Sequence, residues 1–302
     1  MNPPSWLWAA FTLAAAAGQT LRNAAQHDLT PRIGSANATF VRFLFGFPFA
    51  LGFLAIAVPA TGVAAPAPSP TAWTYIAFAS VTQVLATALM LQAIRENSFV
   101  VATALAKTEA LQIVGFGLAF LGDPATPGLI LAVAVATVGV ALLSGATPFA
   151  RGDAGSTRRS AVYGLASASA FALSTVAYRG GVLALGGPSF IVAAAEELVL
   201  ALTLQTTAIV LWLTLFDRAG LRAIAREWRV SLAAGFIGAL STLLWFLAFA
   251  LESAARVRTL GLAEVVVAQI LTHRVFAQRT TAHEMFGIVL VLAGVALALN
   301  RG

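Results

Sequence analysis

Apolar residues fill this chain in long runs, and short polar or turn-forming stretches separate one run from the next. A run of about 20 apolar residues is long enough to cross a bilayer as an α-helix. The pattern therefore predicts an all-α integral membrane protein with ten transmembrane helices. Their expected ranges are Ser5–Ala25, Ser35–Val58, Thr71–Ile94, Ser98–Leu121, Ala125–Ser144, Ser160–Leu185, Ser189–Phe216, Val230–Leu251, Ala254–Ala277 and Thr281–Asn300.

The second half of the chain repeats part of the first half. A shift of 155 residues aligns Leu85–Leu142 with Leu240–Leu297 without a gap, and it pairs Glu109 with Glu264. Matches of Ala, Leu or Val arise easily by chance in membrane sequences, but a matched acidic residue does not. We therefore interpret the match as an internal repeat. The shift also pairs two identical runs, Gly139-Val140-Ala141-Leu142 and Gly294-Val295-Ala296-Leu297.

The repeat predicts two halves of five helices each, residues 1–147 and 160–302, joined by the polar linker 148–159. Because five is an odd number, the second half must enter the membrane in the opposite orientation. Twelve arginines lie in or beside the loops of one side, and four lie on the other side. Positively charged loops favour the cytoplasmic face. We predict two inverted five-helix repeats in a bacterial-type inner membrane, with both termini on the periplasmic side.

Composition narrows the possible functions. Of the 302 residues, 59% are hydrophobic and 10% are charged, the formal net charge is +6, and there is no cysteine. The basic residues are scattered and form no patch interleaved with aromatic residues, so we expect no nucleic-acid partner. The three histidines lack metal-ligand spacing, and the aspartates lie in or near loops. We therefore expect no metal, no cofactor and no enzyme activity.

Two inverted repeats of membrane helices are typical of secondary transporters. In such proteins the two halves rock about a midplane site and open it to each side in turn. Two other classes stay open, a membrane scaffold or assembly subunit and a membrane enzyme. A scaffold predicts a stable protein partner and no transport, and an enzyme needs a catalytic constellation in the membrane.

Each half also carries a short motif before its last helix. In the first half, Phe120-Leu121-Gly122-Asp123 precedes the helix that ends with the first Gly-Val-Ala-Leu run. In the second half, Val275-Phe276-Ala277-Gln278 and then Thr281 precede the second run. These motifs resemble the EamA module of the drug/metabolite transporter superfamily, and the layout is similar to that of the YddG-type amino-acid exporters. The resemblance implies a ten-helix exporter, although Gln278 stands where the family usually has an acidic residue.

Charged residues inside a membrane span are costly and usually functional. At 1.5 Å per residue, Glu109 and Glu264 each lie roughly 15 Å into their predicted helices, close to the midplane. Members of the family that this chain resembles often carry proline there. A carboxylate pair at this depth can bind an amino group or exchange a proton. Lys107 and Arg42 lie at a similar depth and can bind a substrate carboxylate or neutralise a glutamate. Lys107 and Glu109 are two residues apart and cannot pair directly.

The alternative interpretation is a network of salt bridges that ties the helices together. Glu196 and Glu197 fit this alternative, because Arg256 or Arg258 at the start of the ninth predicted helix can pair with either of them. Arg42 fits both interpretations equally well. An unpaired glutamate in the membrane can also be protonated and neutral.

Polar and aromatic residues on predicted helix faces indicate the walls of a cavity. Gln83 lies near the middle of the third span and shares a face with Ser80 and Thr87. Trp245 lies too deep for the interfacial aromatic belt. Together with Tyr178 it offers stacking surface for apolar or aromatic side chains. The alternative is that these polar residues only form hydrogen bonds between packed helices.

These observations predict a secondary transporter that exports small metabolites, above all amino acids with aromatic or hydrophobic side chains. Few basic residues lie deep in the membrane, which disfavours a carrier of phosphates or nucleotide sugars. The alternative is a proton-coupled exporter of lipophilic cations or other drugs. The expected partners are the substrate and the lipid bilayer, with no obligate protein partner. The candidate binding or coupling residues are Glu109, Glu264, Lys107, Arg42, Gln83, Trp245 and Tyr178.

Overall fold

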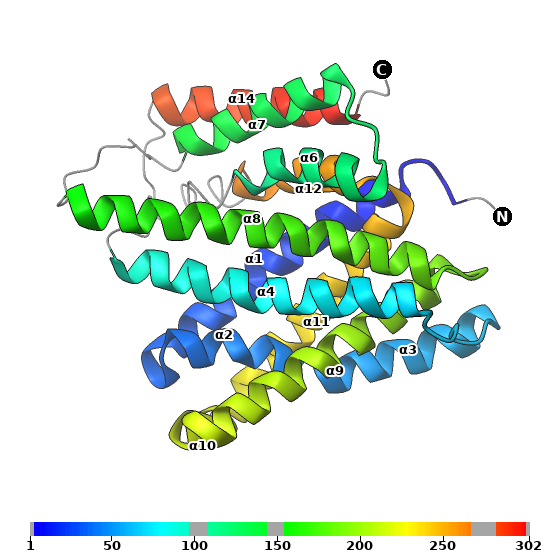
Figure 1. Ribbon diagram of the computed structural model, residues 1–302, viewed down its shortest axis with the longest axis vertical. Helices are drawn as coiled ribbons and strands as arrows, with labels where there is room; N and C mark the ends of the chain where they lie inside the picture. Colours follow the sequence, from blue (N-terminus) through cyan, green and yellow to red (C-terminus); the bar gives the residue numbers. More distant parts are fainter. Residues whose placement is uncertain (1–2, 97–107, 144–153, 267–281, 300–302) are drawn as a thin grey trace. The chain divides into compact units, whose positions relative to one another are not determined.

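The computed structural model describes residues 3–96, 108–143, 154–266 and 282–299. These residues are helical and contain no strand, which confirms the all-α prediction (Figure 1). The helices are α1 (Leu7–Ile33), α2 (Ser35–Leu44), α3 (Phe47–Thr61), α4 (Pro70–Glu96), α6 (Glu109–Leu121), α7 (Pro127–Leu143), α8 (Ala154–Leu185), α9 (Phe190–Phe216), α10 (Arg218–Arg226), α11 (Trp228–Leu251), α12 (Ala254–Gly261) and α14 (Ala282–Leu299).

Several helices are long and apolar enough to cross a membrane. Helices α6 and α7 and most of α14 are apolar but shorter. Helix α1 is not among the long apolar segments, and parts of the fourth and ninth expected spans lie outside the described residues. The protein therefore has the helices of a multi-pass membrane protein, while the number of ten spans stays a prediction. The five segments that satisfy both criteria are Ser35–Thr61, Pro70–Ala93, Arg158–Leu185, Phe190–Phe216 and Trp228–Leu251.

The first helix is longer than the sequence predicts. It continues past Ala25 to Ile33 and ends where Gly34 adopts a φ of 82°. A side chain rarely tolerates that backbone conformation, and glycine adopts it freely. Arg22 therefore lies well inside the helix and not near its end.

The second predicted span is divided into α2 and α3 at Phe45 and Gly46. A Cβ atom at Gly46 would clash with the carbonyl oxygen of Arg42, so glycine is required at this break. Pro48 lies in the first turn of α3, a position that proline tolerates because the first helical N–H groups have no intrahelical acceptor. The break in the second predicted span thus lies just before this proline.

Contacts divide the chain into two compact units. Unit 1 contains the residues up to Val81 together with Ala177–Leu251. Unit 2 contains Thr82–Val176 together with the residues from Glu252 onward. Each unit takes helices from both predicted sequence halves, and α4 and α8 contribute to both units.

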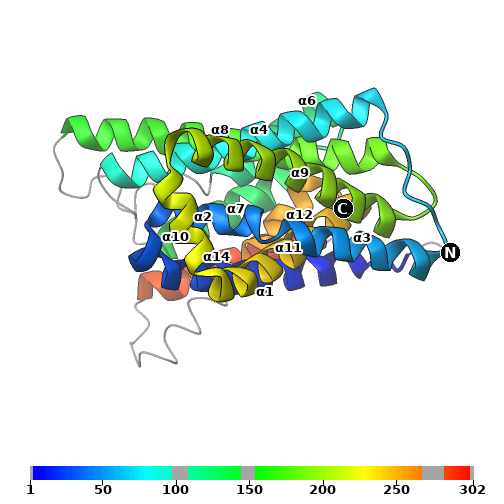
Figure 2. The same cartoon turned by 90° about the horizontal axis from the view of Figure 1, so that it is seen from below.

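In unit 1, α1 packs along α11 through small residues (Figure 2). The Ser241 hydroxyl donates a hydrogen bond to the carbonyl oxygen of Ala15 at 2.7 Å. A Cβ atom at Gly18 would lie only 3.1 Å from the Cβ atom of Ser241. The junction of α2 and α3 also approaches α11, since a Cβ atom at Gly235 would lie 2.6 Å from the Cβ atom of Phe45. Small residues allow such close backbone approach in membranes.

In unit 2, α7 and α14 lie side by side (Figure 1). A Cβ atom at Gly139 would lie 2.7 Å from the backbone nitrogen of Val291, and one at Gly294 would lie 2.7 Å from the Cβ atom of Ala136. The 155-residue shift converts the first contact into the second. The helices run antiparallel and meet through equivalent positions, which gives the repeated glycine a packing role.

Serine side chains link α8 to α4 within unit 2. The Ser160 hydroxyl donates to the carbonyl oxygen of Ala93 at 2.9 Å, and the Ser167 hydroxyl donates to that of Ala86 at 2.8 Å. Both serines are fully buried. For these two serines, therefore, hydrogen bonding between packed helices is the observed role.

Candidate functional site

A buried polar cluster surrounds Tyr178 in unit 1. Tyr178 lies on α8 and is 3% exposed, and its hydroxyl accepts a hydrogen bond from Nε2 of Gln205 on α9 at 3.0 Å. The hydroxyl of Ser80 on α4 lies 3.5 Å from the same oxygen. Ser80 and Gln205 are buried as well. Three helices therefore bring uncharged hydrogen-bonding groups to one phenol.

Two ionisable side chains lie near the Tyr178 hydroxyl, Arg42 from α2 and Glu197 from α9. Glu197 is fully buried, and neither of its carboxyl oxygens has a side-chain partner among the described residues. Its carboxyl group lies against Gly181 of α8. A cationic and an acidic side chain thus lie near the same buried phenol. We call Arg42, Ser80, Tyr178, Glu197 and Gln205 the Tyr178 cluster.

Arg22 of α1 adds a second guanidinium near Arg42. Both side chains pass close to Gly238 of α11. A Cβ atom at Gly238 would lie 3.3 Å from Cδ of Arg22 and 3.3 Å from Cβ of Arg42. Arg22 is 9% exposed, and its Nη2 atom donates to Oδ1 of Asn23 at 3.0 Å. Two neighbouring positive charges repel each other, so this part of unit 1 favours an anionic group.

Aromatic rings provide apolar surface in the same unit. The ring centre of Phe246 lies 4.8 Å from that of Tyr178. Trp245 is 7% exposed and stacks on Phe249, with 6.1 Å between the ring centres and 24° between the ring planes. Such rings suit an apolar or aromatic side chain of a ligand.

Unit 2 contains a second polar group, at the start of α6. Oε1 of Glu109 accepts a hydrogen bond from Nη2 of Arg258 on α12 at 2.8 Å and one from the hydroxyl of Thr175 on α8 at 3.3 Å. The side chains of Arg258 and Glu109 are 23% and 13% exposed. We call Glu109, Thr175 and Arg258 the Glu109 triad. Its carboxylate has a cationic partner inside the protein, so the triad ties three helices together.

Comparison with known proteins shows what this chain is similar to. Residues 5–145, which contain α1 to α7, match the EamA-like transporter family. These residues, slightly under half of the chain, are similar to that family. A solved structure described only as a crystal structure of a protein is similar over 98% of this chain and 96% of its own, with a TM-score of 0.70 and 16% sequence identity. At that identity the likeness concerns the fold alone. A comparison with curated proteins gives no match.

The matched residues include Arg42, Gln83, Lys107 and Glu109 of the predicted site residues. The family that these residues match is described as one of transporters. The apolar helices support the membrane location that such a function requires. Substrate, direction and mechanism are proposals, argued below.

The other predicted residues of unit 2 have different surroundings. Glu264 is half-buried in a helical segment just after α12, and Gln83 is half-buried on α4. Both take part in polar or electrostatic interactions of their own. Lys107 lies outside the described residues. Glu109 has Arg258 as its partner, and the expectation that Glu109 and Glu264 form one carboxylate site stays a prediction.

The arginines at the start of α12 have acidic partners within unit 2. Arg258 belongs to the Glu109 triad, and Nη1 of Arg256 bonds Oε2 of Glu252 at 2.8 Å. A residue four positions away on the same stretch of chain is close enough to pair with Arg256. The expected pairing of Glu196 or Glu197 with Arg256 or Arg258 stays a prediction.

The sequence did not single out Gln205 or Arg22 as site residues. Gln205 is a lone amide in the middle of the apolar run of α9, and an isolated polar residue at that depth is a usable signal. Arg22 was counted with the arginines in or beside loops because the predicted helix ended three residues after it, at Ala25. Within the described residues, no group of three or more potential metal ligands occurs.

Proposed function

We propose that the protein exports zwitterionic amino acids, in particular those with aromatic or large apolar side chains. The observation that carries the proposal is the Tyr178 cluster, in which Arg42 and Glu197 act on one buried phenol. Arg42 suits the substrate carboxylate and Glu197 suits its ammonium group. The rings of Tyr178 and Phe246 suit the apolar side chain.

Alternating access of two inverted repeats is the proposed mechanism. The contact between α7 and α14 supports it, because Gly139 and Gly294 meet their partner helices at positions that the 155-residue shift exchanges. An antiparallel contact between equivalent positions is what an inverted pair requires. The same shift pairs Arg42 with Glu197. The two charged residues of the Tyr178 cluster would then be equivalent positions of the two repeats.

Purified full-length protein in liposomes tests the substrate class. We expect liposomes preloaded with unlabelled phenylalanine to accumulate labelled phenylalanine and leucine by exchange. Arg42→Gln should lower the rate at least tenfold, since a charge-assisted hydrogen bond is worth about 1.5–3 kcal/mol and about 1.4 kcal/mol corresponds to tenfold. Arg95→Gln, which changes an exposed arginine at the end of α4, is the matched control and should retain the wild-type rate. Absence of exchange in the wild type would overturn the proposal.

Export of lipophilic cations is the second candidate function, and the buried carboxyl group of Glu197 favours it. The same liposomes, tested with tetraphenylphosphonium, separate the two candidates. Movement of the cation alone, with a pH-dependent rate, would show the amino-acid proposal to be wrong. Glu197→Gln should reduce transport under both candidates, whereas Glu109→Gln should leave coupling unchanged because Arg258 neutralises Glu109. Loss of proton coupling in Glu109→Gln would mean that Glu109 belongs to the coupling site, as the sequence predicts.

A further inference from the structure

Helix α10 presents a row of arginines on one face. Its residues Arg218, Arg222 and Arg226 are spaced by four, so they follow one another along the same side of the helix. All three are exposed, and Arg229 in the first turn of α11 is exposed as well. The helix connects α9 to α11, two of the segments that are long and apolar enough to span a membrane. This row therefore lies at one surface of the membrane.

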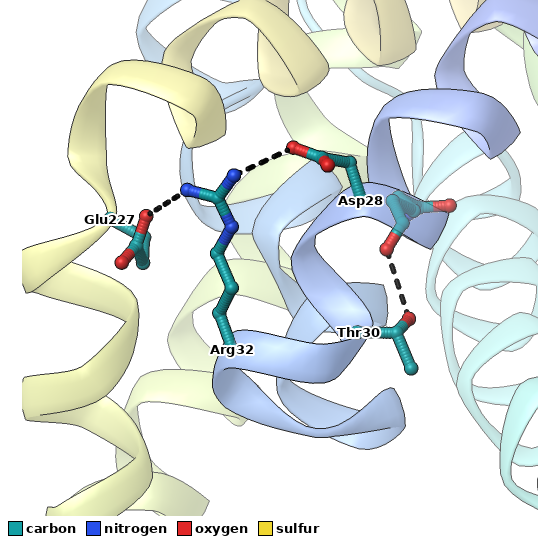
Figure 3. A network of polar contacts seen from close by, with 5 residues as sticks. Asp28, Thr30, Arg32 and Glu227 are labelled. Atoms are coloured by element: carbon teal, nitrogen blue, oxygen red, sulfur yellow. Dashed lines mark hydrogen bonds and ion pairs between the residues drawn. The ribbon is translucent and has the colours of Figure 1, made fainter.

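The acidic residues that flank α10 have partners elsewhere. Oδ1 of Asp217 accepts a hydrogen bond from the backbone N–H of Gly220 at 2.8 Å and caps the helix. Oε2 of Glu227 bonds Nη1 of Arg32 on α1 at 3.2 Å, and Arg32 also bonds Asp28 (Figure 3). Neither acid therefore neutralises the arginine row. Among the described residues, Arg222, Arg226 and Arg229 form no ion pair.

The opposite side of α10 is fixed against unit 1. Gly220 and Ile224 are buried. A Cβ atom at Gly220 would lie 2.8 Å from the side-chain nitrogen of Asn37 on α2, which shows how closely the helix is held. With this side packed, the arginines have to face outward, and the helix has the amphipathic arrangement of a membrane-surface helix.

Exposed aromatic residues flank the row on both sides. Trp212 and Phe216 near the end of α9 are 45% and 75% exposed, and Trp228 at the start of α11 is 49% exposed. The guanidinium carbon of Arg229 lies 5.4 Å from the ring centre of Trp228. Aromatic residues concentrate at the boundary between hydrocarbon and headgroups. These three rings place the arginine row at the level of the lipid headgroups.

We propose that the exposed face of α10, with Arg218, Arg222 and Arg226 and the adjacent Arg229, binds the headgroups of anionic phospholipids. Guanidinium groups recognise phosphate oxygens with paired hydrogen bonds, and several basic residues at one surface add their attraction to anionic lipids. The loop between α3 and α4, Gly62–Ser69, has no charged residue, so it offers no comparable site.

Native mass spectrometry of the full-length protein in detergent with phosphatidylglycerol or phosphatidylcholine tests the proposal. We expect phosphatidylglycerol to be retained in preference to phosphatidylcholine, and Arg222→Gln with Arg226→Gln to weaken that retention about tenfold. The lysine double variant at the same positions should keep most of the retention and verifies that the fold survives. Arg158→Gln with Arg159→Gln removes the same charge from an exposed site on α8 and is the matched control.

Thermal unfolding in phosphatidylcholine vesicles with and without phosphatidylglycerol provides a second readout. Wild type and control should gain thermal stability from the anionic lipid, and the Arg222/Arg226 glutamine variant should lose most of that gain. Equal lipid retention in that variant and the wild type would overturn the proposal. Equal loss in the Arg158/Arg159 control would overturn it too, because total charge and not α10 would then determine binding.

Discussion

The Tyr178 cluster and the Glu109 triad differ in how their acidic side chains are paired within an apolar protein. In the triad, Arg258 and Glu109 are 2.8 Å apart, and both are partly exposed. In the cluster, Glu197 is fully buried and has no side-chain partner among the described residues, and the central phenol accepts a hydrogen bond from the uncharged Gln205. The triad is complete in itself, whereas the cluster has an acidic group that a ligand can complement. This difference supports the proposed binding role of the cluster and favours a structural role for the triad.

Breaking the triad should have the largest effect on stability. Arg258→Gln removes the cationic partner of Glu109. Breaking a fully buried pair costs about 3–5 kcal/mol, and partial exposure lowers this to about 2 kcal/mol. Thermal unfolding in detergent measures the loss. The double variant Glu109→Gln with Arg258→Gln should recover at least half of it, because neither charge is then left alone. A strong loss of transport in a folded double variant would contradict the structural role.

Two glycine substitutions compare the packing next to the Tyr178 cluster, at Gly181, with the packing on α6, at Gly117. At Gly181 a Cβ atom would clash with the carboxyl group of Glu197 and lie 2.9 Å from Ile76, so Gly181→Ala should destabilise the protein by about 1–2 kcal/mol. At Gly117 of α6 the nearest atom is Oδ2 of Asp123 at 3.4 Å. Gly117→Ala should be neutral or stabilise by up to about 1 kcal/mol, since alanine favours helix. Melting temperatures of the two variants should change in opposite directions relative to the wild type. A change in the same direction would show that Glu197 has room to move.

Removing the phenol oxygen of the cluster should affect transport more than stability. Tyr178→Phe deletes the acceptor of Gln205 and should cost about 1 kcal/mol of unfolding free energy. If the phenol positions a substrate, the exchange rate of labelled phenylalanine should fall about tenfold. Tyr163→Phe changes a half-buried tyrosine elsewhere on α8 and is the matched control. An unchanged exchange rate in Tyr178→Phe would mean that the hydroxyl only joins helices, as the serines of α8 do.

Local sequence patterns predicted the helices better than the partners of the charged residues. Helix α9 was expected at Ser189–Phe216 and is observed at Phe190–Phe216, because turn-forming residues and Asp217 bound its apolar run. Arg258 and Glu109 are 149 residues apart in sequence, so their pairing depends on tertiary packing that periodicity does not report. The arginines of α10 were read as loop charges, although their spacing of four residues already indicated a helix face.

The smallest expected effect tests how the triad is built. The hydroxyl of Thr175 bonds Glu109 at 3.3 Å, while Arg258 bonds the same oxygen at 2.8 Å. Thr175→Val keeps the shape of the side chain and leaves the ion pair in place, so the loss should be about 0.5 kcal/mol. Thr203→Val, at an exposed threonine of α9 that bonds only its own helix, is the matched control and should change stability by less. Combined with Arg258→Gln, however, Thr175→Val should cost more than it does alone, because the hydroxyl is then the remaining donor of the triad. Additive losses would show that the hydroxyl and the guanidinium act on Glu109 independently. Thr175 would then not be coupled to the ion pair of Glu109 and Arg258.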